Sequence, residues 1–94
     1  MKSEVARSEY EKMIFDEIIR TKVKDMLNMY EGISLSALSR ATGIPVPTLS
    51  RALNGERKLN MFLVYKICTA LKMPMSTFFI DIDEKFRNYM IENS

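Results

Sequence analysis

The sequence predicts an all-α domain of five or six helices. Apolar residues recur at three- and four-residue spacings along most of the 94 residues, and no segment alternates like a strand. The three glycines fall between the periodic segments, where helices end. With 47% hydrophobic and 28% charged residues the composition is that of a globular chain, and the length allows one domain, residues 1–94.

The first predicted element is a long amphipathic helix over about residues 8–31. Its stripe repeats with helical spacing, and Gly32 then ends it because glycine tolerates the left-handed backbone of a helix terminus. The stripe consists of Met13, Ile14, Ile18, Val23, Met26, Leu27 and Tyr30.

Two short helices come next. Ser34 is placed as the N-cap of LSALSRAT, which Gly43 stops. A helix over 46–54 follows, with Pro47 in its first turn, where the missing N–H costs little, and Gly55 after its end.

The last part of the chain is predicted to form further helices. Asn60 can cap a helix over about 61–72, and Ser76 can cap a short helical turn. Asp83 can cap a final, separate helix over 83–92. The stripe of the 61–72 helix is Val64, Ile67, Cys68 and Leu71.

Charge is distributed unevenly. The net charge is only +2, but residues 34–75 hold six basic side chains against the single acid Glu56, and the flanking segments are slightly acidic. A concentrated positive field suits nucleic acid, although a solvated surface is the ordinary alternative.

Several function classes are disfavoured. The chain has no histidine and a single cysteine, Cys68, so we expect no catalytic residues, no metal site, no cofactor and no internal disulfide. The acids Asp81, Asp83 and Glu84 are interpreted as helix-capping residues. Apolar runs are too short for a membrane span and the N-terminus lacks a signal core, so we expect a cytoplasmic protein without membrane contact.

The pair of short helices predicts a helix-turn-helix. Its inward apolar positions are Leu35, Leu38, Ile44, Leu49 and Leu53, with the small Ser39 where the helices approach. The outward face of the second helix then carries Val46, Pro47, Ser50, Arg51 and Asn54. Such a helix can enter a major groove and place Arg51 against a guanine edge. The alternative is an ordinary helical hairpin of a bundle.

The stretch SLSALSRATGIPVPTLSRALNGERK, followed by LNMFLVYKICTALKMPMSTFF, resembles the lambda-repressor-like (Cro-type) helix-turn-helix family. The likeness covers a core of residues 23–79 and implies a five-helix DNA-binding domain. The matching positions are Leu38, Ser39, Gly43, Leu49, Asn54, Gly55 and 67–71.

The resemblance implies a set of DNA contacts. Bases would be read by Val46, Pro47, Ser50 and Arg51, and the backbone would be contacted by Thr48, Asn54, Arg57, Lys58 and Asn60. Three features depart from the family. Leu35 stands where a phosphate-binding glutamine is common, Pro45 replaces a polar cap, and Val46 and Pro47 replace hydrogen-bonding readers. Readout there would be apolar, as against a thymine methyl.

Both ends exceed the family core. Residues 3–16 extend the first helix, and the 83–92 helix is extra. The surplus aromatics Phe79, Phe86 and Tyr89 are predicted to form a dimer interface, because aromatic residues favour interfaces. The alternatives are a simple cover for the core, or an interface on the extension at Tyr10, Ile14 and Phe15.

Together these features predict a repressor-like transcriptional regulator of phage or bacterial character. It would bind double-stranded DNA at a near-palindromic operator as a homodimer. The alternative is an antitoxin or anti-repressor that uses the same fold to hold a protein partner.

Overall fold

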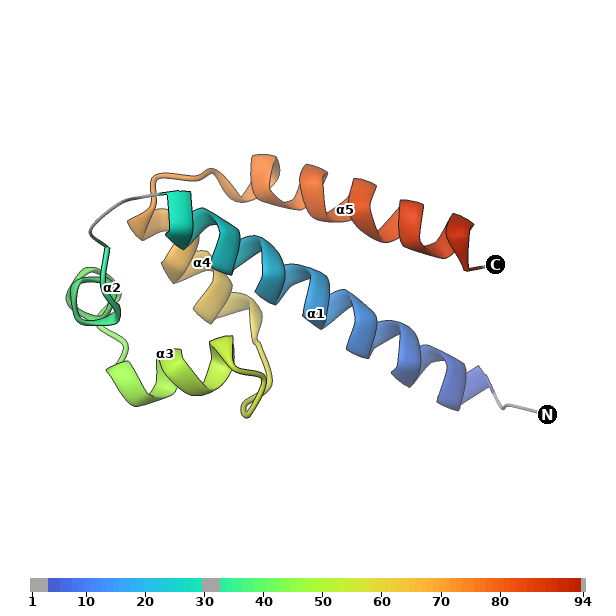
Figure 1. Ribbon diagram of the computed structural model, residues 1–94, viewed down its shortest axis with the longest axis horizontal. Helices are drawn as coiled ribbons and strands as arrows, with labels where there is room; N and C mark the ends of the chain where they lie inside the picture. Colours follow the sequence, from blue (N-terminus) through green and yellow to red (C-terminus); the bar gives the residue numbers. More distant parts are fainter. Residues whose placement is uncertain (1–3, 30–32, 94) are drawn as a thin grey trace.

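The computed structural model of the protein describes residues 4–29 and 33–93 and confirms the all-α prediction. Five helices and no strands occur within those two ranges (Figure 1). Their bounds are α1 Glu4–Met29, α2 Leu35–Thr42, α3 Val46–Leu53, α4 Met61–Ala70 and α5 Met75–Glu92.

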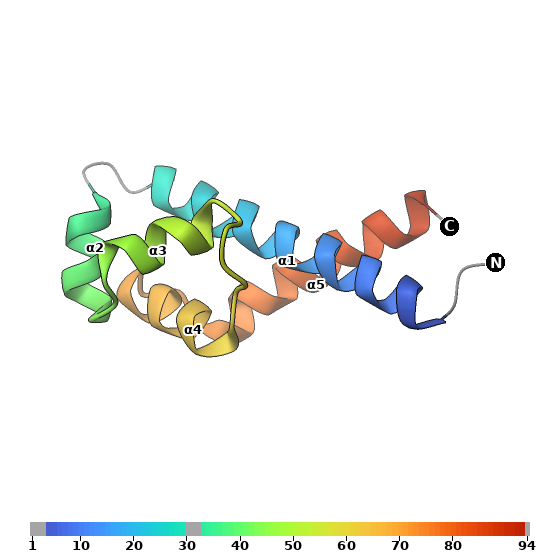
Figure 2. The same ribbon diagram turned by 90° about the horizontal axis from the view of Figure 1, so that it is seen from below.

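The molecule is elongated, with principal extents of 47 × 24 × 19 Å. At one end, α2, α3 and α4 gather around the C-terminal half of α1 and the start of α5 (Figures 1 and 2). The other halves of α1 and α5 project from this core toward the opposite end. We call this projection, residues 4–16 of α1 and 83–92 of α5, the terminal arm.

All five helices contribute to one hydrophobic core. Burial of each large side chain there contributes about 1.5–3 kcal/mol relative to exposure. The buried set comprises Ile19, Val23, Met26, Leu38, Leu49, Ala52, Leu53, Leu63, Val64, Ile67, Cys68, Leu71, Phe78 and Ile82. The predicted stripe of α4 is therefore confirmed, and Cys68 is a core residue whose burial raises its thiol pKa.

The stripe of α1 differs in part from the prediction. The helix begins by Glu4 and extends to Met29, and Tyr30 and Gly32 lie outside the described residues. Met13 is 56% exposed, whereas Ile19, absent from the predicted stripe, is buried. The reason is geometric: six steps along the helix place Met13 roughly 120° away from Ile19 around the helix axis.

Two predicted caps are present. Ser34 Oγ accepts a hydrogen bond from the Ala37 N–H at 3.1 Å, and Asn60 Oδ1 accepts one from the Leu63 N–H at 2.8 Å. Each satisfies an N–H that the first helical turn leaves without a partner, and such a cap contributes about 1 kcal/mol.

The separate C-terminal helix is corrected by the structure. α5 runs without a break from Met75 to Glu92, with Pro74 at its N-cap, so neither Ser76 nor Asp83 begins a helix. No proline or glycine lies between Phe79 and Glu84, and the backbone has no reason to stop there. The expected extra helix is the C-terminal half of α5.

The terminal arm is held by contacts between α1 and α5. The rings of Phe15 and Phe86 lie 5.4 Å apart between centroids, and the hydroxyls of Tyr10 and Tyr89 are hydrogen-bonded at 3.2 Å. That hydrogen bond raises the pKa of Tyr89. The phenylalanine pair lies at the edge of the core, which Phe15 contacts, and the tyrosine pair joins the same two helices further along the arm, so α1 and α5 form one continuous antiparallel pair.

No helix among the described residues is by itself long and apolar enough to cross a membrane. α4 and α5 reach that length and composition only when taken together, across a bend of 118°.

Candidate nucleic-acid interface

The turn between α2 and α3 is fixed by local hydrogen bonds. Gly43 has φ of +75° and its N–H donates to the Ser39 carbonyl at 2.8 Å, which ends α2. A left-handed backbone of this kind favours glycine. Beside it, the buried Thr42 hydroxyl donates to the Leu38 carbonyl at 2.8 Å and accepts from the Ile44 N–H at 3.2 Å. The angle between α2 and α3 is thus set by the residues of the turn itself.

The inner face of the α2–α3 pair packs as predicted. Leu38, Leu49 and Leu53 are buried in the core, and Leu35 and Ile44 are partly buried against it. Leu49 is fully buried and Leu38 nearly so, which anchors both short helices to the same core. Because α2 and α3 each have only eight residues, this packing rather than intrinsic helix stability holds them.

The outer face of α3 presents the predicted DNA-reading residues. Pro47 and Arg51 are exposed, and Val46, Thr48 and Ser50 are partly exposed. Pro45 occupies the N-cap and provides no side-chain cap, so the amide groups of the first turn stay available to other acceptors. Arg51 stands in the last turn of this face with the longest donor side chain.

The loop after α3 carries more positive charge. Gly55 has φ of +82°, and after it the N–H groups of Glu56 and Arg57 both donate to the Arg51 carbonyl, at 2.9 and 3.2 Å. Arg57 and Lys58 are exposed. The loop that carries Arg57 and Lys58 is therefore held by backbone hydrogen bonds to Arg51, in the last turn of α3.

The family model for the Cro/C1-type HTH DNA-binding domain matches residues 22–84. That range contains α2, the turn, α3, the cationic loop and α4, and it is well over half of the chain. The chain belongs to this family. No curated protein and no solved structure was found to match it.

In this Cro/C1-type domain α3 is the predicted recognition helix, and two of the residues predicted to contact the DNA backbone also make contacts within the chain. Asn60 uses its Oδ1 to cap α4, and Asn54 Nδ2 lies 3.4 Å from Ser50 Oγ on the helix surface. Both side chains remain exposed. Their contact with phosphates stays a prediction.

The three residues predicted for the dimer interface pack within the chain. Phe79 meets the edge of Phe78, with ring centroids 5.4 Å apart, and partly covers the core. Phe86 and Tyr89 contact α1 in the terminal arm, as described above. All three are half-buried, so a second copy could reach only their remaining surface.

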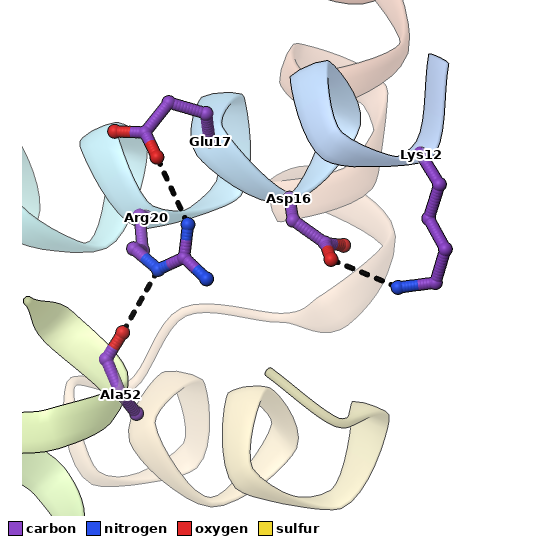
Figure 3. Close-up of polar contacts among 5 residues, drawn as sticks. All are labelled: Lys12, Asp16, Glu17, Arg20 and Ala52. Carbon is purple, nitrogen blue, oxygen red and sulfur yellow. Dashed lines mark hydrogen bonds and ion pairs between the residues drawn. The ribbon is translucent and has the colours of Figure 1, made fainter. Parts of the chain in front are cut away.

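One residue behind α3 that no sequence pattern indicates is Arg20 on α1. Its Nε donates a hydrogen bond to the Ala52 carbonyl in α3 at 2.9 Å, and its Nη1 pairs with Glu17 at the same distance (Figure 3). Arg20 follows the buried Ile19 directly, but nothing in its spacing separates it from the surface lysines of α1. Its role depends on a contact between residues 32 positions apart.

Proposed function

We propose that the chain is a sequence-specific, repressor-like transcriptional regulator that reads a near-palindromic operator as a homodimer. The observation that carries the proposal is Arg51, exposed in the last turn of the recognition helix, with its carbonyl holding the cationic loop. Membership of a DNA-binding family supplies the partner class. Such a regulator acts on cytoplasmic DNA.

In this proposal the outer face of α3 enters the major groove. Arg51 donates two hydrogen bonds to the O6 and N7 atoms of a guanine, and Ser50 contacts a neighbouring base edge. Val46 and Pro47 offer only apolar surface, which fits a thymine methyl group. Thr48, Asn54, Arg57, Lys58 and Asn60 meet the phosphate backbone and set the position of the helix.

We infer dimerisation from the small size of the DNA-reading surface on α3. One eight-residue helix contacts too few base pairs to select a site in a genome, and two-fold pairing doubles the site. The terminal arm is the segment that we assign to this pairing. Val5, Tyr10 and Met13 leave large apolar surfaces exposed on its α1 side, and Phe86 and Tyr89 contribute what they do not bury against α1.

The test is selection of bound sequences from a pool of random duplex DNA. We expect an inverted repeat whose half-sites lie about 10–10.5 base pairs apart, or a multiple of that spacing. Selection of a single, unrepeated half-site would contradict the homodimer. Absence of any enriched motif would contradict sequence-specific binding.

A protein-binding module remains the second candidate, because α4 exposes Met61, Phe62 and Tyr65 on its surface. An antitoxin or anti-repressor would use such apolar surface to hold a protein. A gel shift on random-sequence DNA with competitor separates the two functions, since the regulator retains DNA and the module does not.

A further inference from the structure

We propose that Arg20 is a positioning residue, which fixes the C-terminal end of the recognition helix and so orients Arg51 and the loop cations. This inference rests on the proposed function, because it concerns how α3 and the loop after it are held against DNA. It assigns to α1 a part in DNA recognition without any contact with DNA.

The contact itself is short and shielded from water. Arg20 Nε lies 2.9 Å from the Ala52 carbonyl oxygen, and only 11% of the Arg20 side chain is exposed. Glu17, one turn earlier on α1, holds Nη1 at 2.9 Å (Figure 3). A guanidinium held at two of its nitrogens has a fixed plane, so it can act as a rigid support.

The Ala52 carbonyl lies at the C-terminal end of α3, where a helix carbonyl lacks its usual donor. The last carbonyls of a helix have no N–H four residues later to accept from, and they form the negative end of the helix dipole. Ala52 stands next to the last residue of α3, and its carbonyl otherwise receives only a long 3.3 Å bond from the Gly55 N–H among the contacts described. A cationic donor at this position stabilises the helix end more strongly than a neutral one.

The same guanidinium also lies beside the start of the loop. A Cβ built at position 55 would lie 3.8 Å from both Cζ and Nε of Arg20, so a side chain there would touch the guanidinium, and glycine leaves this space open. Gly55 connects Ala52 to the amides of Glu56 and Arg57, which bond to the Arg51 carbonyl. Arg20 therefore supports the one segment through which Arg51 and Arg57 are held together.

Three variants of the full chain test the assignment. Arg20→Met keeps an unbranched side chain but removes the donors and the charge. Arg20→Lys keeps the charge but cannot reproduce the planar fork. Lys24→Met is the matched control, because it removes one positive charge from an exposed position of the same helix outside the terminal arm.

The first readout is amide hydrogen exchange by NMR, without DNA. In Arg20→Met, loss of a charged hydrogen bond should speed exchange at Gly55, Glu56 and Arg57 by about tenfold. In Arg20→Lys the increase should be smaller. Exchange at Ile67 and Cys68 in α4 should not change, and Lys24→Met should match the wild type throughout. Unchanged exchange at the loop amides of Arg20→Met would overturn the proposal.

The second readout is affinity for the selected operator and for random DNA at several salt concentrations. Arg20→Met should lose about tenfold affinity for the operator and less for random DNA, because the phosphate-contacting cations of the loop remain but are held less firmly, and the salt slope should stay nearly unchanged. A direct phosphate contact would instead lower that slope by about 0.9, and this result would overturn the positioning role.

The two proposals fail separately. If the wild type binds no DNA, the proposed function fails, while hydrogen exchange still decides whether Arg20 holds the loop. If Arg20→Met does not fold, the lysine variant replaces it, and faster exchange confined to the loop is again the expected result. Exchange raised equally in the loop and in α4 would assign Arg20 a general structural role and overturn the inference.

Discussion

At the scale of single residues, the recognition helix depends on a small number of side chains. Val46 and Pro47 bring no side-chain hydrogen-bond donors to its N-terminal end, so in the proposed complex direct readout of guanine would rest on Arg51. The backbone around Arg51 is held by the loop amides and, in our proposal, by Arg20. We therefore expect that the Arg51 side chain and the contacts that hold the backbone around it can be disrupted independently.

Replacing Arg51 by alanine should relax sequence preference at one base pair of each half-site. A bidentate arginine–guanine contact is worth about 1–3 kcal/mol of discrimination, and the exposed side chain is not needed by the core. Repeating the selection with this variant measures the change. Lys24→Ala, at an exposed position of α1, is the control, and a selected site identical to that of the wild type would show that Arg51 does not read a base.

Replacing Arg57 and Lys58 together by alanine should weaken binding to operator and random DNA alike. Each phosphate contact contributes about 0.9 to the slope of log affinity against log salt, so the slope should fall by about 1.8. Titrations at several salt concentrations measure it. A loss of affinity restricted to the operator would count against a backbone role for this loop.

At the scale of elements, α1 and α5 are joined by a charged contact at the edge of the core. Lys22 Nζ lies 2.6 Å from Asp81 Oδ2, and Lys85 approaches the same oxygen at 3.4 Å. The hydrogen bond from Lys22 is the main cause that lowers the pKa of Asp81 below its ordinary value of 3.8. The contact helps to align the arm-bearing helices, although its partial exposure limits its energy.

Asp81→Asn should therefore lower the free energy of unfolding by about 0.2–1 kcal/mol at neutral pH. Because the pKa of Asp81 is lowered in the folded state, its contribution is complete above pH 3.8 and is lost as the pH falls through the folded value. Urea unfolding of both proteins at neutral pH and at about pH 2 measures the difference, which should vanish in acid. Asp25→Asn, at an exposed position of α1, is the control. A difference that persists in acid would contradict the ionic origin.

Much of the fold was predictable because each of the shorter helices has a local signal at its start or its end. Ser34 and Asn60 cap α2 and α4 as expected, and Gly43 ends α2. The break at Asp83 was wrong, because an acid can sit within a helix as well as cap one, and here it pairs with Arg87. Arg20 was missed since its partner is a distant backbone carbonyl, for which no side-chain pattern exists.

At the scale of the whole molecule, the proposed DNA-reading and dimer surfaces lie toward opposite ends of the long axis. The recognition helix belongs to the core end, and the terminal arm projects away from it (Figure 1). In the dimer that we propose, the recognition helices would lie about 34–36 Å apart, one turn of DNA. The continuous helix α1 would fix the distance and orientation between the terminal arm and the recognition helix.

Replacing Val5 and Ile91 by glutamate should give folded monomers that bind the operator weakly. These arm residues are 68% and 72% exposed, so the substitutions leave the core intact and place charge in the expected interface. Sedimentation measures the mass. Ile80→Glu is the control, on the same α5 but outside the arm and 71% exposed, and it should remain dimeric. Phe86 is unsuitable for this test, because it also packs on Phe15.

A dimeric double variant would move the interface away from the arm. A wild-type protein that is monomeric at micromolar concentration would contradict the homodimer and favour the protein-binding module.

The loop after the recognition helix is tied to the carbonyl of Arg51 rather than to its side chain. Every amino acid has that carbonyl, so a substitution at position 51 leaves the anchor in place. In the proposed complex, an inherited change there would alter which operator is bound without loosening the loop that we expect to contact the phosphates. The same property makes position 51 suitable for engineering a regulator that binds a different operator sequence.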